Sequence, residues 1–219
     1  VYFEICNNYI SIVSSGSISN IQAAAILIHG IKTTLGGTNL IANNTIHSEC
    51  YYNSSNSSYG PVGIYMQPTN GQNLVIVNNY IFSDNSSNNS YYYGTSPAIK
   101  ANSTVNNALL ANNFYTGSSF AVNFSGSSLV DNGTSPSNWT FNTTNGFITG
   151  NDGVDMGVDQ VEYRDIDNTR NDIGTVGGPH TWSNYHTTNG KAAIFNLSLP
   201  SQLYIGGNHN IKAKGFHKN

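Results

Sequence analysis

Side chains that could act as acids or bases are scarce in residues 1–150. Hydrolysis of a glycosidic bond uses two carboxyl groups that flank the bond, and proton abstraction uses a base within hydrogen-bond reach. This part of the chain offers four carboxylates, two lysines and two histidines, which are Glu4, Glu49, Asp84, Asp131, Lys32, Lys100, His29 and His47. We expect them not to gather on one face of the fold, and a single histidine on a strand usually has a structural role. We therefore predict that the chain has no catalytic residues.

Residues 151–179 are rich in charge and contain six of the eight aspartates and both of the arginines of the chain. Oxygen ligands at this density could hold calcium, and Asp165, Asp167 and Asp172 are the candidate ligands. Alternatively, the arginines pair with some of the carboxylates, and other carboxylates cap tight turns. The spacing matches neither an EF-hand nor a glycine-rich calcium repeat, so we favour the second interpretation and expect no cofactor.

Tyrosines gather in two stretches that are rich in Asn and Ser, residues 49–60 and 83–97. Exposed aromatic rings beside amide groups suit contacts with sugars, whereas the alternative is that the rings pack the two stretches together. The candidate carbohydrate-binding residues are Tyr51, Tyr52, Tyr59, Tyr91, Tyr92 and Tyr93. Sequons for N-glycosylation occur at Asn53, Asn56, Asn85, Asn102, Asn138 and Asn142. A chain this rich in Asn, Ser and Thr also forms several such sequons by chance.

An asparagine pair followed by a short apolar run recurs along the first two-thirds of the chain. The first asparagines of the pairs, separated by 36, 35 and 34 residues, are Asn7, Asn43, Asn78 and Asn112. Apolar runs precede the last three pairs, at residues 39–42, 74–77 and 108–111. A nearly fixed period of this size is typical of stacked structural repeats. The sequence therefore predicts a solenoid.

The paired asparagines also indicate which solenoid this is. A sharp turn between strands often needs a left-handed backbone conformation, which Asn tolerates better than most residues. Asparagines at equivalent positions of successive coils can bond amide to amide along the axis. A β-propeller or a leucine-rich repeat is the competing fold, but the Trp-Asp and regular leucine signatures are absent. We predict an all-β, right-handed parallel β-helix in which the structural asparagines are Asn43, Asn44, Asn78, Asn79, Asn112 and Asn113.

The repeat predicts the strands and loops of each coil. The apolar run 23–29 favours a buried strand over a helix, because glycine and β-branched residues flank it. The insertions 49–60 and 83–97 leave their coils at the same point after the pair, so they should emerge on one side, where solenoids often bind. The fourth coil runs to residue 130, and the repeat then decays across 132–150. The residues that we expect to face one core are Leu40, Leu74, Ile76, Ile81 and Leu109.

The charged segment between Asp152 and Pro179 has a recognisable spacing. It resembles the pattern D-x-D-G-x-x-R-x-D-x-G, with one residue fewer between the second Asp and the Arg and with Asn168 in place of Gly, and the corresponding residues are Asp165, Asp167, Arg170 and Asp172. This pattern is similar to the one that ends the helix in secreted bacterial proteins of the pectin-lyase-like superfamily. The resemblance implies a β-helix in residues 1–150, a closing segment in 151–179 with a structural Arg170, and a β-strand extension or the start of a further domain in 180–219. The extension resembles the segment that follows the β-helix in surface proteins of Bacteroidetes, and the superfamily is rich in polysaccharide lyases and hydrolases.

Composition limits the partners of the chain. Charged residues make up only 9% of the sequence and the net charge is -3, so no basic surface is available for nucleic acid. No apolar run approaches the roughly 18 residues that a membrane-spanning helix needs. Cys6 and Cys50 occupy different repeat positions, so we expect free thiols, with a disulfide as the alternative.

These features predict a secreted, extracellular or cell-surface β-helix with a structural or adhesive role and no active site. The alternative is a carbohydrate-binding or polysaccharide-cleaving module whose partner is a surface polysaccharide or glycan. The sequence begins inside a repeat at Val1, and residues 192–216 contain strand-like runs without a core of their own. We therefore also expect copies to associate head to tail into a filament by strand addition, unless upstream coils of a longer protein cap the first coil.

Overall fold

The part of the chain that the structure describes consists of thirteen segments. They are given by a computed structural model and comprise residues 3–15, 24–29, 38–51, 61–67, 73–84, 97–116, 119–134, 140–141, 148–149, 153–165, 169–179, 193–198 and 212–216. None of these residues belongs to a helix that is long and apolar enough to cross a membrane.

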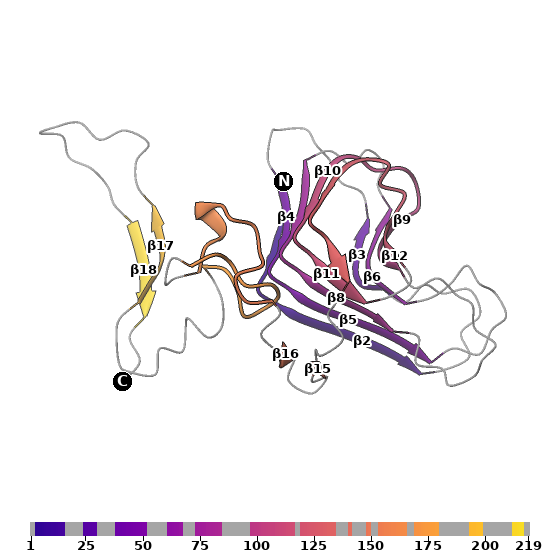
Figure 1. The fold of residues 1–219 in the computed structure, drawn as a ribbon, viewed down its shortest axis with the longest axis horizontal. Helices are drawn as coiled ribbons and strands as arrows, with labels where there is room; N and C mark the ends of the chain where they lie inside the picture. Colours follow the sequence, from indigo (N-terminus) through magenta and orange to yellow (C-terminus); the bar gives the residue numbers. More distant parts are fainter. Residues whose placement is uncertain are drawn as a thin grey trace, which may run out of the picture.

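Three parallel sheets form the walls of a solenoid around one core (Figure 1). The first sheet contains β1 (Glu4–Cys6), β4 (Asn39–Ala42), β7 (Leu74–Val77), β10 (Asn106–Ala111) and β13 (Gly126–Val130). The second contains β2 (Tyr9–Ser15), β5 (Thr45–Tyr51), β8 (Tyr80–Asp84), β11 (Phe114–Thr116) and β14 (Gly133–Thr134). The third contains β3 (Ala24–His29), β6 (Val62–Gln67), β9 (Pro97–Ala101) and β12 (Ser119–Val122).

The predicted fold class is confirmed by the order of these strands. Each of the first four coils gives one strand to each sheet in turn, and equivalent strands of successive coils pair in parallel. Residues 24–29 of the apolar run form the strand β3 (Ala24–His29), as predicted, and not a helix.

The remaining elements are short. Two antiparallel pairs follow the coils, β15 (Thr140–Phe141) with β16 (Ile148–Thr149) and, near the end, β17 (Ala193–Ser198) with β18 (Lys212–Phe216). A single turn of 3₁₀ helix, η1 (Val161–Tyr163), lies between these pairs in the sequence. The two tail strands that the sequence predicts therefore pair with each other (Figure 1).

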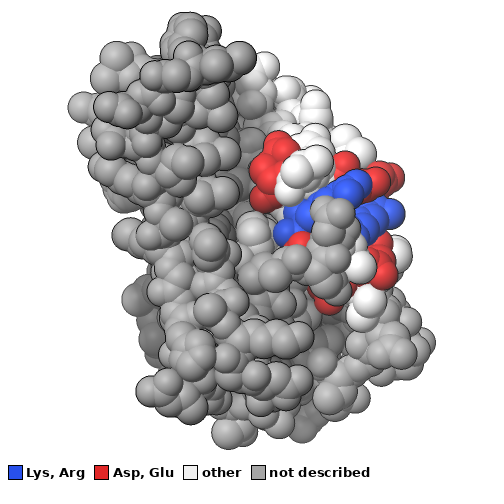
Figure 2. Space-filling view, turned by 90° about the vertical axis from the view of Figure 1, so that its left-hand side faces the viewer, with Lys and Arg blue, Asp and Glu red and all other residues white. Residues whose placement is uncertain are grey.

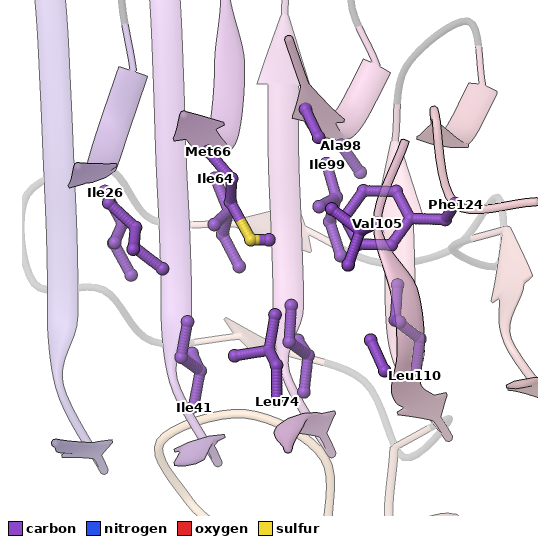
Figure 3. Packing of buried hydrophobic residues seen from close by; sticks show 14 of the residues in the cluster. Ile26, Ile41, Ile64, Met66, Leu74, Ala98, Ile99, Val105, Leu110 and Phe124 are labelled. Carbon is purple, nitrogen blue, oxygen red and sulfur yellow. The ribbon is translucent and has the colours of Figure 1, made fainter. Parts of the chain in front are cut away.

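The core is built from columns of stacked aliphatic side chains. In the first sheet, Ile41, Ile76 and Leu110 are register partners and are fully buried. Figure 3 shows Ile41 and Leu110 of this sheet pointing toward the third sheet, where Ile64 and Ile99 form an equivalent column. Because side chains alternate between the two faces of a strand, one apolar residue in two is enough to line the interior. The predicted core positions Leu74, Ile76 and Ile81 are confirmed, each with no exposed surface.

The prediction that Leu40 and Leu109 face the same core is wrong. Both lie three residues before an asparagine pair, whereas the inward residues Ile41 and Leu110 lie two residues before it. Neighbouring residues in a strand point to opposite faces, so Leu40 and Leu109 lie on the outer face of the first sheet. Leu109 is accordingly 37% exposed, and Leu40 packs against an outer cluster.

The prediction that the repeat decays from residue 132 is also wrong, because the structure contains part of a fifth coil. Strand β13 pairs with β10, and β14 pairs with β11. Asn132 follows Asn113 by 19 residues and takes the same place in the turn. The step is short because β11, β12 and β13 follow one another without a long insertion. A search at a period near 35 residues therefore misses this coil.

Candidate functional site

The second asparagine of each pair points inward and forms a continuous ladder along the solenoid. Its members are Asn8, Asn44, Asn79, Asn113 and Asn132. Asn79 is representative and fully buried, and its Nδ2 lies 2.9 Å from the carbonyl oxygens of Val77 and Ile41 and from Oδ1 of Asn113. Its own Oδ1 accepts from the backbone N–H and the Nδ2 of Asn44, at 3.0 and 2.9 Å. Every polar atom of this buried amide therefore has a partner, as burial requires.

The first asparagine of each pair makes the turn itself. Asn7, Asn43, Asn78 and Asn112 have φ angles of 56°, 55°, 57° and 50°, in the left-handed region, and Asp131 of the fifth coil has 48°. Asn and Asp enter this region more easily than other residues with a side chain. The predicted reason for the asparagine pairs is confirmed, and the two members of a pair have different roles. The first adopts the left-handed conformation of the turn, and the second forms hydrogen bonds between successive coils.

Residues 153–165 and 169–179, here called the flanking segment, lie along the outside of this turn. Nδ2 of Asn112 donates to the carbonyl of Met156 at 3.0 Å, and the backbone N–H of Val158 donates to Oδ1 of Asn78 at 2.7 Å. Nδ2 of Asn43 donates to Oδ1 of Asn171 at 2.7 Å, and Nδ2 of Asn7 donates to the carbonyl of Gly177 at 2.7 Å. The resemblance implies a segment that ends the helix, whereas the structure places it across the first four coils.

Apolar contacts hold the flanking segment on the same face. Val158 and Tyr163 pack against the outward residues Ala42, Val77 and Ala111 of the first sheet. Burial, with smaller contributions from Glu162 and Cys6, raises the pKa of the Tyr163 hydroxyl. On the second sheet, Tyr80 and Phe114 point outward and form a buried cluster with Ile173, which is 1% exposed. The segment thus covers the outer faces of two sheets beside the turn.

Three charged side chains of the flanking segment form hydrogen bonds with backbone groups of the same segment. Oδ1 of Asp172 accepts from the backbone N–H of Asp155 at 2.8 Å, and Oδ1 of Asp165 accepts from the N–H of Gly178. Nε of Arg170 donates to the carbonyl of Gly157 at 2.6 Å, which differs from the carboxylate pairing that the sequence predicts for the arginines. Figure 2 shows positive side chains of this face gathered beside negative ones.

A carboxylate pairing of the predicted kind occurs at Arg164, whose Nη2 lies 3.0 Å from Asp159. Among the described residues, no three His, Cys, Asp or Glu side chains are close enough to hold a metal ion. Asp167, the third candidate calcium ligand, lies outside the described residues. The described aspartates of the candidate set thus act as caps of backbone N–H groups.

Removal of metal ions is therefore expected to leave stability unchanged. A chelator in excess should shift the melting temperature of the wild-type chain by less than about 1 °C, because Asp165 and Asp172 accept from backbone N–H groups. Arg170→Ala should lower it slightly by removing the bond to Gly157. Thermal melts followed by circular dichroism measure both. A fall of many degrees with the chelator, reversed by added calcium, would instead establish a calcium site.

The stems of the predicted insertions are stacked. Strands β2, β5 and β8 pair in register on the side where the chain leaves the second sheet, and β3, β6 and β9 pair where it returns. Of the candidate carbohydrate-binding residues, Tyr51 ends β5, and the others lie outside the described residues: Tyr52, Tyr59, Tyr91, Tyr92 and Tyr93. Of the sequons, Asn102 is exposed after β9, and the others lie outside the described residues: Asn53, Asn56, Asn85, Asn138 and Asn142.

The cysteines occupy different places, as their repeat positions predict. Cys6 is a free thiol opposite Ala42, whereas the backbone of Cys50 lies opposite Ser14. Burial raises the pKa of the Cys6 thiol, which therefore stays protonated at neutral pH.

The outer face of the second sheet brings together groups that the sequence predicts to be scattered. Ser11 and His47 are register partners, and Oγ of Ser11 lies 3.0 Å from Nδ1 of His47. Nε2 of His47 lies 3.7 Å from Oε2 of Glu49, and the backbone of Asp84 lies opposite Glu49. Two equal offsets in the sequence could have predicted that these residues lie side by side. Ser11 and His47 each lie four residues after the first asparagine of a pair, and Glu49 and Asp84 each lie six residues after it.

The other candidate groups are dispersed. Glu4 is on the first coil and Asp131 is in the turn of the fifth coil, at opposite ends of the solenoid. His29 is exposed at the end of β3, and Lys100 is on β9 of the third sheet. Lys32 lies outside the described residues.

These features define the class of the protein: a parallel β-helix with an internal asparagine ladder and a flanking segment laid over its turn. Searches of protein-family models, curated proteins and solved structures found no match to the chain.

Proposed function

We propose that this chain is a secreted or cell-surface β-helix of the pectin-lyase-like type that serves structure or adhesion. In this role it acts as a rigid support that presents loops to a surface polysaccharide or glycan, without cleaving it. The observation that carries the proposal is the stacking of β2, β5 and β8, together with β3, β6 and β9. Since stacked strands are about 4.8 Å apart, the points at which the insertions leave and rejoin the sheets lie close together.

Hydrogen bonds between coils make the β-helix a rigid support for the loops. Successive coils are joined by the ladder amides, and the flanking segment binds the turns of four coils at once. A loop that is held on such a scaffold loses less conformational entropy on binding than a loop on a mobile one. The sequence resemblance of residues 152–179 to secreted β-helix proteins supports the location.

Replacement of the three consecutive tyrosines Tyr91, Tyr92 and Tyr93 by Ser is expected to weaken binding to a glycan by about tenfold or more, equivalent to about 1.4 kcal/mol. The melting temperature should stay unchanged. An array of surface polysaccharides probed with the wild-type chain would identify the ligand, and a titration would compare the variants. Val161→Ser is a suitable control, because Val161 is 78% exposed and belongs to the flanking segment.

Equal affinity of the triple variant and the wild type would contradict the adhesive role of these loops. The polysaccharide-cleaving alternative has its own signature. Incubation with acidic polysaccharides would release unsaturated products that absorb ultraviolet light, or new reducing ends, and either result would replace the structural role with a lyase or hydrolase.

A further inference from the structure

Three side chains on the outer face of the second sheet are arranged as a nucleophile, a base and an orienting acid. Ser11 is exposed on β2, and its Oγ lies 3.0 Å from Nδ1 of His47 on β5. The side chains of His47 and Glu49 are only 4% and 14% exposed, and Nε2 of His47 lies 3.7 Å from Oε2 of Glu49. Thus an exposed serine lies beside an imidazole and a carboxylate that are largely buried.

The position of Glu49 selects the tautomer of His47. A carboxylate beside Nε2 favours a proton on that nitrogen, which leaves Nδ1 as the acceptor for the hydroxyl of Ser11. A base whose other nitrogen is held by an acid is the general arrangement that activates a serine. The separation of 3.7 Å exceeds hydrogen-bond length, but such contacts commonly shorten when a substrate is bound.

The surroundings hold the imidazole in this orientation. Phe82 follows His47 in the same register column, and the two rings meet edge to face, with centroids 6.2 Å apart. Phe82 itself packs against Tyr80, with centroids 4.6 Å apart. The ring of His47 is therefore fixed by neighbours on both sides, Ser11 in the preceding coil and Phe82 in the next.

We propose that Ser11 is a nucleophile toward carboxylic esters, with His47 as its general base and Glu49 as the positioning residue. The inference goes beyond the proposed structural role and does not depend on it. An ester on a bound polymer is a fitting substrate, because β5, which carries His47 and Glu49, leads directly into the insertion 49–60. Removal of an acyl group would alter the polymer without cutting its chain.

The reaction balances with water as the co-reactant. Oγ of Ser11 bonds to the carbonyl carbon of the ester while its proton passes to Nδ1 of His47. The bond from that carbon to the alcohol oxygen breaks, and the alcohol leaves with the proton. Water then attacks the acyl-serine and gives a proton to Nδ1, the bond between Oγ and the acyl carbon breaks, and Oγ recovers the proton as the carboxylic acid departs.

A fluorophosphonate probe tests the proposal, because it phosphonylates activated serines and the adduct is visible in the intact mass. The full chain should gain one adduct, and Ser11→Ala should gain none. Ser128→Ala, which removes an exposed serine from β13 of the first sheet, should react like the wild type. Glu49→Gln should slow labelling of Ser11 by about tenfold or more, consistent with general-base assistance. In the wild type, labelling should need the neutral imidazole, because only that form can accept the proton of Ser11.

The same variants should be compared in the hydrolysis of p-nitrophenyl acetate, with circular dichroism to confirm that each is folded. Absence of an adduct on the wild type, or an adduct that persists in Ser11→Ala, would overturn the proposal. Labelling of Ser11 at the same rate and with the same pH profile in Glu49→Gln would overturn the role of Glu49.

Discussion

Ile76→Asp is expected to unfold the β-helix at room temperature, whereas Leu109→Asp leaves it folded. Ile76 is fully buried between Ile41 and Leu110, so the variant loses an aliphatic contact worth about 2–5 kcal/mol and buries a carboxylate without a partner. The total exceeds about 5 kcal/mol, which is comparable with the whole stability of a typical domain. Leu109 is 37% exposed on the outer face, where a carboxylate keeps its water.

Circular dichroism and the elution volume of the two variants measure this difference. The pair is informative because both residues belong to the first sheet and differ in the face that they occupy. Unfolding of both variants to the same extent would contradict the register that the structure gives to this sheet. A folded Ile76→Asp variant would contradict the position of the core.

Asn79→Leu is expected to cause the second-largest loss of stability, about 3 kcal/mol or more. Leucine has nearly the same shape as asparagine but leaves the backbone N–H of Asn44 without its acceptor and the carbonyls of Ile41 and Val77 without a donor from the ladder. Each buried polar group left in this way costs about 1–3 kcal/mol. For a chain of this size, the melting temperature should fall by roughly 10 °C.

Asn8→Leu provides the control for this prediction. Asn8 occupies the same ladder position in the first coil but is exposed, so water can replace its hydrogen bonds. The melting temperature of this variant should change by only a few degrees. Equal losses in the two variants would show that the effect comes from the turn conformation and not from the buried amides.

The predictions from the sequence succeeded where they depended on a local rule that repeats. The pairs at Asn43, Asn78 and Asn112 predicted both the left-handed turn and the ladder, because each depends on the residue type at one repeated position. They failed at Leu40 and Leu109, because an error of one residue in the strand reverses the face. The fifth coil was not predicted, because the absence of a long insertion shortens the period. Its turn is nevertheless of the same type, with Asp131 in the left-handed conformation and Asn132 in the ladder.

The grouping of side chains around His47 could have been predicted from the sequence. Its four-residue offset from Asn43 equals that of Ser11 from Asn7, and in a parallel stack equal offsets place residues side by side. The rotamers that bring Oγ of Ser11 to Nδ1 of His47 and bury the ring could not be predicted in this way. They depend on neighbours from three coils.

By itself, the sequence determined the class of fold and the chemistry of its turn, because a repeated word gives every coil the same local preference. Only the tertiary structure decided where the flanking segment lies. Its spacing of Asp and Arg defines the internal caps of the segment, such as the one between Asp172 and Asp155. Its position depends on contacts of Asn171 and Ile173 with Asn43 and Tyr80, which lie more than 90 residues away in the chain. Such contacts follow no period, and so the placement of the segment along the side of the helix is a property of the assembled fold.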